Sequence, residues 1–257
     1  MPTTPRSIAP AASPLPVVPF AWPPAAPIAG TGHRDLSPFA AAQVWQLLDE
    51  ALVGIALGGR RDITILQLGC GEGGWLRRLA MRADALGFNR IRVRGVEPCN
   101  ALIGRAAAMA AEATRSLPVG RLCLSVEHGE PETRLRDPDA SIDLVLCFEM
   151  SGAPARVARL AGELARVTAN RLCVVMPGRE AAPTAASGTV AAILRERLDR
   201  VRVRGLDLFH ERFGIASGDG DPVFLSRLDE LERFHAEDPA FIDHAAHILL
   251  TAERRRH

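Results

Sequence analysis

Apolar residues recur along the chain with two alternating periods. Between residues 37 and 58 the spacing is helical, with Ser37-Pro38 as an N-cap followed by proline and Gly58-Gly59 as a stop. Apolar runs then predict strands at 63–68, 91–96, 121–126, 142–148 and 172–176, and helical spacing predicts helices at 75–86, 101–116 and 153–169. Strands separated by helices of this length favour a parallel sheet with helices on both faces.

The regular alternation of predicted strands and helices ends in the last third of the chain. A helix at 190–198 and strands at 201–209 and 246–252 are predicted, with the segment 210–245 inserted between the two strands. Within the insert, helical spacing indicates one helix from Leu225, Leu228, Leu231 and Phe234. Adjacent strands need only a short connection, so an insert of this length is expected to shape specificity.

Residues 1–33 differ from the rest, with nine prolines and no periodic apolar face. Proline lacks an amide donor and blocks a helical signal sequence, so a disordered arm that folding does not need is predicted. The remaining residues, 34–257, are predicted to form one domain. No stretch is expected to reach the roughly 18 apolar residues of a membrane helix, which favours a cytoplasmic protein without a membrane partner.

Composition narrows the class of protein further. Of 257 residues, 47% are hydrophobic and 24% are charged, with a net charge of +1. These values are ordinary for a globular protein and give no general attraction to nucleic acid or membranes. The five cysteines form no CxxC pair or Cys/His cluster, so the sequence predicts buried, reduced thiols and no metal site. Three of them lie in predicted strands: Cys123, Cys147 and Cys173.

The strongest motif joins the first strand to the next helix and reads LQLGCGEGG from Leu66 to Gly74. Glycines at this junction permit a tight turn and let the backbone approach a ligand closely. The spacing fits both GxGxG and GxGxxG. It is therefore compatible with either S-adenosylmethionine or a nicotinamide dinucleotide.

A carboxylate, Glu97, ends the second strand, 24 residues after Gly73. An acid at this position can accept hydrogen bonds from both hydroxyls of a ribose. The alternative is a solvated carboxylate at a strand end. Position and spacing together favour the ribose interpretation.

Three later segments carry a family resemblance: SIDLVLCF from Ser141, ELARV from Glu163 and NRLCVVMP from Asn170. With the glycine motif, they make residues 61–180 resemble the class I S-adenosylmethionine-dependent methyltransferases, most of all the small-molecule group with its type 11 and glycan-type branches. The resemblance implies a three-layer, Rossmann-like α/β fold. Its seven-stranded sheet would have the order 3-2-1-4-5-7-6, with strand 7 antiparallel.

The resemblance also implies roles for individual residues. S-adenosylmethionine would cross the carboxyl ends of strands 1, 2 and 4, with the glycine turn making room for its methionine and ribose parts. Glu130 would bind the adenine amino group, and Phe148 would lie near the reactive end. The implied cofactor-binding residues are Gln67, Gly69, Cys70, Gly71, Gly73, Glu97, Pro98, Glu130 and Phe148.

Two departures from the family pattern keep alternatives open. Gln67 stands where an acid is usual, and Pro131 has no backbone N–H to offer to adenine. An inactive methyltransferase-like scaffold or partner subunit is therefore a second hypothesis. A nicotinamide-dependent oxidoreductase is a third, which the turn disfavours because it carries Glu72 and no basic residue before Arg77.

The preferred reading is an enzyme that methylates oxygen or nitrogen of a small molecule by in-line displacement without a metal. Glu149 or His210 could serve as general base, and the alternative for both is a polar side chain that only faces solvent. Nucleic acid is disfavoured as a substrate, because the sequence after Phe148 lacks the N/D-P-P-aromatic signature and no basic stripe with aromatic residues is present. The identity of the acceptor, the methylated atom and the oligomeric state are not predicted.

Overall fold

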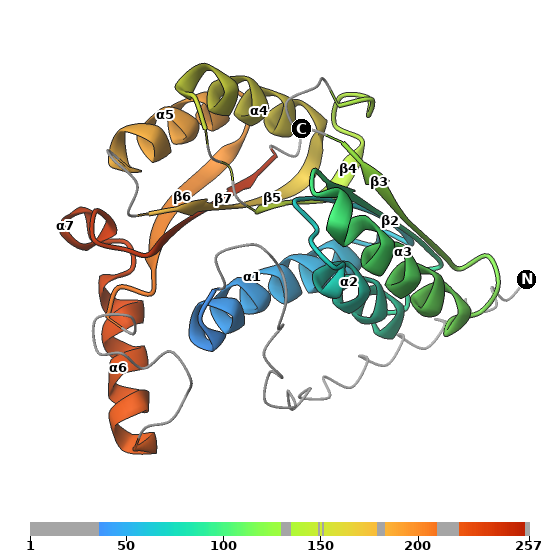
Figure 1. Cartoon of the computed structure of the whole chain (residues 1–257), viewed down its shortest axis with the longest axis horizontal. Helices are drawn as coiled ribbons and strands as arrows, with labels where there is room; N and C mark the ends of the chain where they lie inside the picture. The colour runs from blue at the N-terminus through green and yellow to red at the C-terminus, as the bar shows by residue number, and fades with distance from the viewer. Residues whose placement is uncertain are drawn as a thin grey trace, which may run out of the picture.

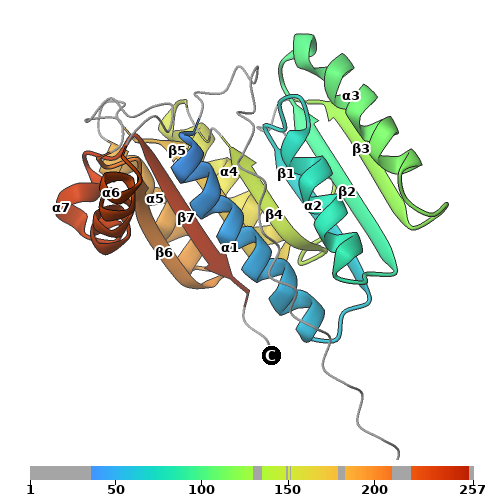
Figure 2. The same cartoon turned by 90° about the horizontal axis from the view of Figure 1, so that it is seen from below.

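The structure, a computed structural model, describes residues 36–129, 135–148, 150, 152–178, 183–209 and 221–254. A central sheet separates α1, α2 and α3 on one face from α4 and α5 on the other (Figures 1 and 2). The helices are α1 (Pro38–Leu57), α2 (Gly74–Ala85), α3 (Asn100–Arg115), α4 (Pro154–Val167), α5 (Pro183–Arg195), α6 (Pro222–His235) and α7 (Pro239–Ile242). The strands are β1 (Asp62–Leu68), β2 (Arg90–Glu97), β3 (Leu122–His128), β4 (Ile142–Phe148), β5 (Thr168–Pro177), β6 (Asp199–Leu206) and β7 (His247–Glu253).

The described strands form one seven-stranded sheet in the order β3-β2-β1-β4-β5-β7-β6. Strands β1 to β5 pair in parallel, whereas β7 runs antiparallel to β5 and β6. The predicted fold class is therefore confirmed. Because parallel strands share one carboxyl edge, the ends of β1, β2 and β4 lie together where the glycine motif begins.

Each face of the sheet has its own apolar core, as side-chain alternation along the strands requires. On β1, Ile63 and Ile65 pack with residues of α1 and α2, whereas Leu66 and Leu68 pack with residues of α4 and α5. Gln67 shares the first of these faces, since it alternates with Ile63 and Ile65. Its polar side chain therefore lies on the α1 and α2 side, at the end of an otherwise apolar strand.

Helix α1 begins at the predicted N-cap, where Ser37 Oγ accepts a hydrogen bond from Ala40 N–H at 3.1 Å. Its most apolar 18-residue window reaches a mean hydropathy of 1.2, enough by length and composition for a membrane span. That finding is contrary to the sequence-based expectation. Core helices pass the same test, and Val44, Leu48 and Leu52 are at most 1% exposed in the core beneath α1.

The insert contains the predicted helix, α6, and a short helix, α7, that the apolar pattern did not reveal. Glu232 of α6 is 0% exposed, and its carboxylate accepts from Leu208 N–H at 2.9 Å and Phe209 N–H at 2.7 Å. Helix α6 is thereby attached to the end of β6. It extends away from the sheet on the side of α1 (Figure 1).

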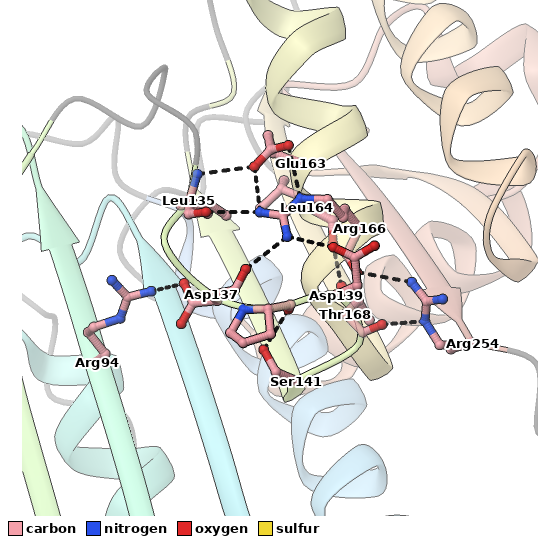
Figure 3. Close-up of polar contacts among 11 residues, drawn as sticks. Arg94, Leu135, Asp137, Asp139, Ser141, Glu163, Leu164, Arg166, Thr168 and Arg254 are labelled. Atoms are coloured by element: carbon pink, nitrogen blue, oxygen red, sulfur yellow. Dashed lines mark hydrogen bonds and ion pairs between the residues drawn. The ribbon is translucent and has the colours of Figure 1, made fainter.

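The ELARV segment at the end of α4 holds the chain that leads into β4 (Figure 3). Arg166 donates to the carbonyls of Leu135 and Asp137 at 2.9 and 2.8 Å and forms ion pairs with Asp139 and Glu163. Glu163 in turn accepts from Leu135 N–H at 3.1 Å. Hydrogen bonds to Glu163 and Asp139 raise the pKa of Arg166, so its guanidinium stays protonated at any practical pH.

The cysteines correct one prediction. Cys70, Cys147 and Cys173 are buried, whereas Cys99 and Cys123 are exposed. β3 is an edge strand on which Leu122 is buried and the neighbouring Cys123 points to the opposite, exposed side. The sequence pattern identified the strand correctly but could not show that it lies at the edge of the sheet.

Candidate functional site

The glycine motif folds into a tight turn between β1 and α2. Gly69, Gly71 and Gly73 all have positive φ, at 67°, 56° and 88°, a conformation that other residues adopt at a cost. The turn is fixed to β2, because Gly69 N–H and Cys70 N–H both donate to Val96 O, at 2.9 and 3.2 Å. The turn is also closed internally, because Gly73 N–H donates to Cys70 O at 2.9 Å and the side chain of Met109 lies over Gly73.

Glu97 lies directly beside this turn and is 1% exposed. Its Oε2 accepts from Gly71 N–H at 2.7 Å, and its Oε1 accepts from Cys99 N–H at 2.9 Å. The carboxylate thus joins the turn after β1 to the start of α3. A carboxylate has about four acceptor positions, so these two bonds do not by themselves exhaust it.

Gln67 is also 1% exposed and lies on the neighbouring strand. Its Nε2 donates to Gly69 O at 3.4 Å, an orientation of the amide that is favoured because the flipped one would place two oxygens together. Its Oε1 is buried and has no hydrogen-bond partner within the described part of the chain. Native proteins rarely leave a buried acceptor in this state, so this oxygen is open to a donor from outside the chain, a water or a ligand.

Cys70 and Pro98 support this site through different contacts. The Cys70 thiol is 3% exposed and packs against β2, where a Cβ on Gly95 would lie 2.8 Å from its sulfur. Burial, and then the charge of Glu97, raises the pKa of this thiol to about 12, so it is neutral at physiological pH. Pro98 O accepts from His128 Nε2 at 3.0 Å. Both residues therefore shape the backbone around the glycine turn.

Phe148 ends β4 and contacts Trp75 in the first turn of α2, with ring centroids 5.3 Å apart. Trp75 in turn lies 6.2 Å from Trp45 of α1. The guanidinium of Arg78 lies 4.6 Å from the Trp45 ring centroid, and burial lowers the pKa of Arg78 to about 10. The sequence indicated Phe148 but not the other two aromatic residues, which helical periodicity presents as core positions.

The glycine turn is not negatively charged, as Glu72 alone would suggest, because an ion pair neutralises this residue. Arg105 of α3 pairs with Glu72. Glu72 therefore has a basic neighbour in the folded protein, although none is close to it in the sequence. Because Arg105 neutralises Glu72, the turn still offers no net positive charge to a pyrophosphate.

A second polar cluster at the same edge of the sheet was not predicted. Asp207, just after β6, is 3% exposed and has φ 55°. It accepts from Ser37 Oγ and, at 3.3 Å, from Ser37 N–H. His247 Nδ1 lies 3.7 Å from Asp207 Oδ2 and has no hydrogen bond within the described residues. Only the strand order brings these three residues together, so no local motif could have revealed them.

Several predicted residues lie outside the described residues: Glu130, Pro131, Glu149, His210 and the arm 1–33. The other predicted cofactor residues come together at the ends of β1, β2 and β4. Among the described residues, no group of three or more His, Cys, Asp or Glu side chains could hold a metal ion.

The sheet order and the glycine turn define the fold of class I S-adenosylmethionine-dependent methyltransferases. Residues 65–171 match the profile of a family described as a methyltransferase domain. The resemblance found in the sequence is thereby confirmed, while the branch within the superfamily remains a prediction. No curated protein sequence matches the chain.

Solved structures agree with the fold. A protein assigned as a sarcosine dimethylglycine methyltransferase from Galdieria sulphuraria is 16% identical, with a TM-score of 0.52, covering 83% of this chain and 85% of that one. The cyclase SpnF is 18% identical, with a TM-score of 0.51, covering 87% and 85%. At such identities the likeness concerns the fold alone.

Proposed function

We propose that the chain binds S-adenosylmethionine at the ends of β1, β2 and β4 and transfers its methyl group to a small molecule. The observation that carries this proposal is the buried Gln67 Oε1, which lacks a donor beside a left-handed glycine turn and the acid Glu97. The amino group of the cofactor is a donor that fits this acceptor. Its ribose hydroxyls are donors that fit Glu97.

The cofactor supplies a methyl group on a sulfonium, whose leaving group is a neutral thioether. The task of the protein is therefore to orient the reactants and exclude water, which can contribute about 7–11 kcal/mol. In this chain, Glu97 would hold the ribose and Gln67 the ammonium. Phe148 and Trp75 would exclude water from the methyl-bearing end.

An acceptor hydroxyl or ammonium group must also lose a proton. His247 is a further candidate for that base, because its Nδ1 lies 3.7 Å from Asp207 Oδ2, a carboxylate that can orient the ring and leave Nε2 for the acceptor. Strand β7, which carries His247, lies two positions from β4 in the sheet. This position favours a role for His247 at the acceptor rather than at the cofactor. Glu149 and His210 remain candidates from the sequence.

The two other hypotheses differ in their support. A nicotinamide-dependent oxidoreductase of the doubly wound type would have the parallel order 3-2-1-4-5-6, whereas β7 here is antiparallel and lies between β5 and β6. An inactive scaffold is favoured by Gln67 in place of an acid. The likeness to a cyclase is a reminder that this fold can carry another reaction.

A thermal shift assay separates these hypotheses. S-adenosylmethionine and S-adenosylhomocysteine should raise the melting temperature, whereas NAD and NADP should not. At 100 times its dissociation constant, a ligand adds about 2.7 kcal/mol to the free energy of unfolding. A shift with NAD alone would overturn the proposal, and no shift with any of the four would favour the scaffold.

Shortening the insert should alter acceptor use and leave cofactor binding intact. Its described part is attached to β6 through Glu232, whereas the predicted cofactor residues lie on β1, β2 and β4. Replacing 210–241 by a short linker should leave the affinity for S-adenosylhomocysteine unchanged in calorimetry, while turnover with the wild-type acceptor falls. Lower cofactor affinity with unchanged acceptor selectivity would instead assign the insert to the cofactor side.

A further inference from the structure

Phe148 lies on the same face of the sheet as the unsatisfied amide of Gln67, and Trp75 packs on Phe148. In the register of β1 and β4, Gln67 is opposite Leu146 and Leu68 is opposite Cys147. Phe148 comes next on β4, and because alternate residues share a face, it is on the same face of the sheet as Leu146 and Gln67. Trp75 packs against that ring with an interplanar angle of 49°.

The pair is placed where the charged part of the proposed cofactor must lie. Glu97 marks the ribose on one side, and the Gln67 oxygen marks the amino group on the other. The sulfonium lies chemically between these two groups, since it links the ribose to the amino-acid chain. The faces of aromatic rings carry negative potential, so rings at this place can attract a positive charge.

Trp45, Trp75 and Phe148 form an aromatic cluster whose two ends differ in charge, because Arg78 lies only at the Trp45 end. Arg78 lies 4.6 Å from the Trp45 centroid and 5.8 Å from that of Trp75, so a cation is already present at the α1 end. Phe148, at the other end, is the last residue of β4, which ends at the edge of the sheet where the glycine motif begins. Trp75 lies between the two and contacts both rings.

We infer that Trp75 and Phe148 bind the sulfonium of S-adenosylmethionine and make the site prefer it to the neutral thioether of S-adenosylhomocysteine. This inference rests on the proposed function and deepens it. The preference would assist turnover, because the product loses the charge that the rings attract. Trp75 and Phe148 are thus specificity-determining residues, while Gln67 and Glu97 bind parts that substrate and product share.

The test compares dissociation constants by calorimetry for S-adenosylmethionine, S-adenosylhomocysteine and sinefungin, which has an ammonium in place of the sulfonium. In Trp75→Leu, affinity for the two cationic ligands should fall about 2- to 30-fold relative to S-adenosylhomocysteine, the range of a cation–π contact. Phe148→Leu retains apolar bulk and should shift the preference in the same direction, which keeps the test decisive if Trp75→Leu does not fold.

Trp45→Leu is the matched control, because it removes a ring of the same cluster from the far side of Trp75. It should leave the ratio of the three affinities unchanged. Equal losses for all three ligands in Trp75→Leu and Phe148→Leu would show that the rings only pack, and would overturn the inference. Failure of the wild-type protein to bind any of the three would instead overturn the proposed function.

Discussion

Gly71→Asp is expected to abolish binding of S-adenosylhomocysteine. Gly71 is buried with φ 56°, and its N–H donates to Glu97 Oε2 at 2.7 Å. An aspartate at this position would place a second carboxylate beside Glu97 and fill space that the cofactor needs, and two adjacent carboxylates repel one another. The measurement is the thermal shift that saturating S-adenosylhomocysteine produces in the wild-type protein and in the variant.

Gly120→Asp is the matched control for backbone strain. Gly120 has φ 81° in an exposed turn, and no atom would lie within 4 Å of a Cβ added there. This variant carries the same left-handed strain and the same charge far from the motif, so it should keep the full ligand-induced shift. A full shift in Gly71→Asp would show that the glycine turn is not the cofactor site.

Glu97→Ala is expected to reduce affinity for S-adenosylhomocysteine by about 1.5–3 kcal/mol, as for hydrogen bonds to a charged group. That loss corresponds to roughly 10- to 150-fold in the dissociation constant. The free energy of unfolding should also fall, because Gly71 N–H and Cys99 N–H lose their acceptor. Calorimetry should therefore be performed at a temperature where circular dichroism shows the variant to be folded.

Glu127→Ala serves as the comparison for Glu97→Ala. Glu127 is an exposed acid on β3 that pairs with Arg94, so its removal should leave the affinity unchanged. Glu97→Gln should lose less than Glu97→Ala, since the amide oxygen still accepts. Equal affinities for the wild-type protein and Glu97→Ala would exclude the ribose role.

The sequence predicted the fold well because most of its elements have a strong local signal. Strands with a continuous apolar run, such as 142–148, were located to the residue. The start of α5 was placed too late, at 190 rather than Pro183, because the first residues of this helix are small and polar and show no apolar period. Helix α7 is only four residues long, which is too short for periodicity to register.

The candidate site was predictable only where its residues belong to one motif. The glycine turn and Glu97 are recognisable because strand ends place them by rule. The contacts of Asp207 with Ser37 and of Arg105 with Glu72 span 170 and 33 residues. Such pairs depend on strand order and helix packing, which local patterns do not encode.

The distribution of thiols has a practical consequence for chemical labelling. Burial raises the pKa of Cys173 to about 12, as it does for Cys70, so both thiols are protonated at neutral pH. Alkylating reagents react with thiolates and should therefore modify the exposed Cys99 and Cys123 first. In a Cys123→Ser background, a fluorophore on Cys99 would sit two residues from Glu97 and report on ligand occupancy without a catalytic assay.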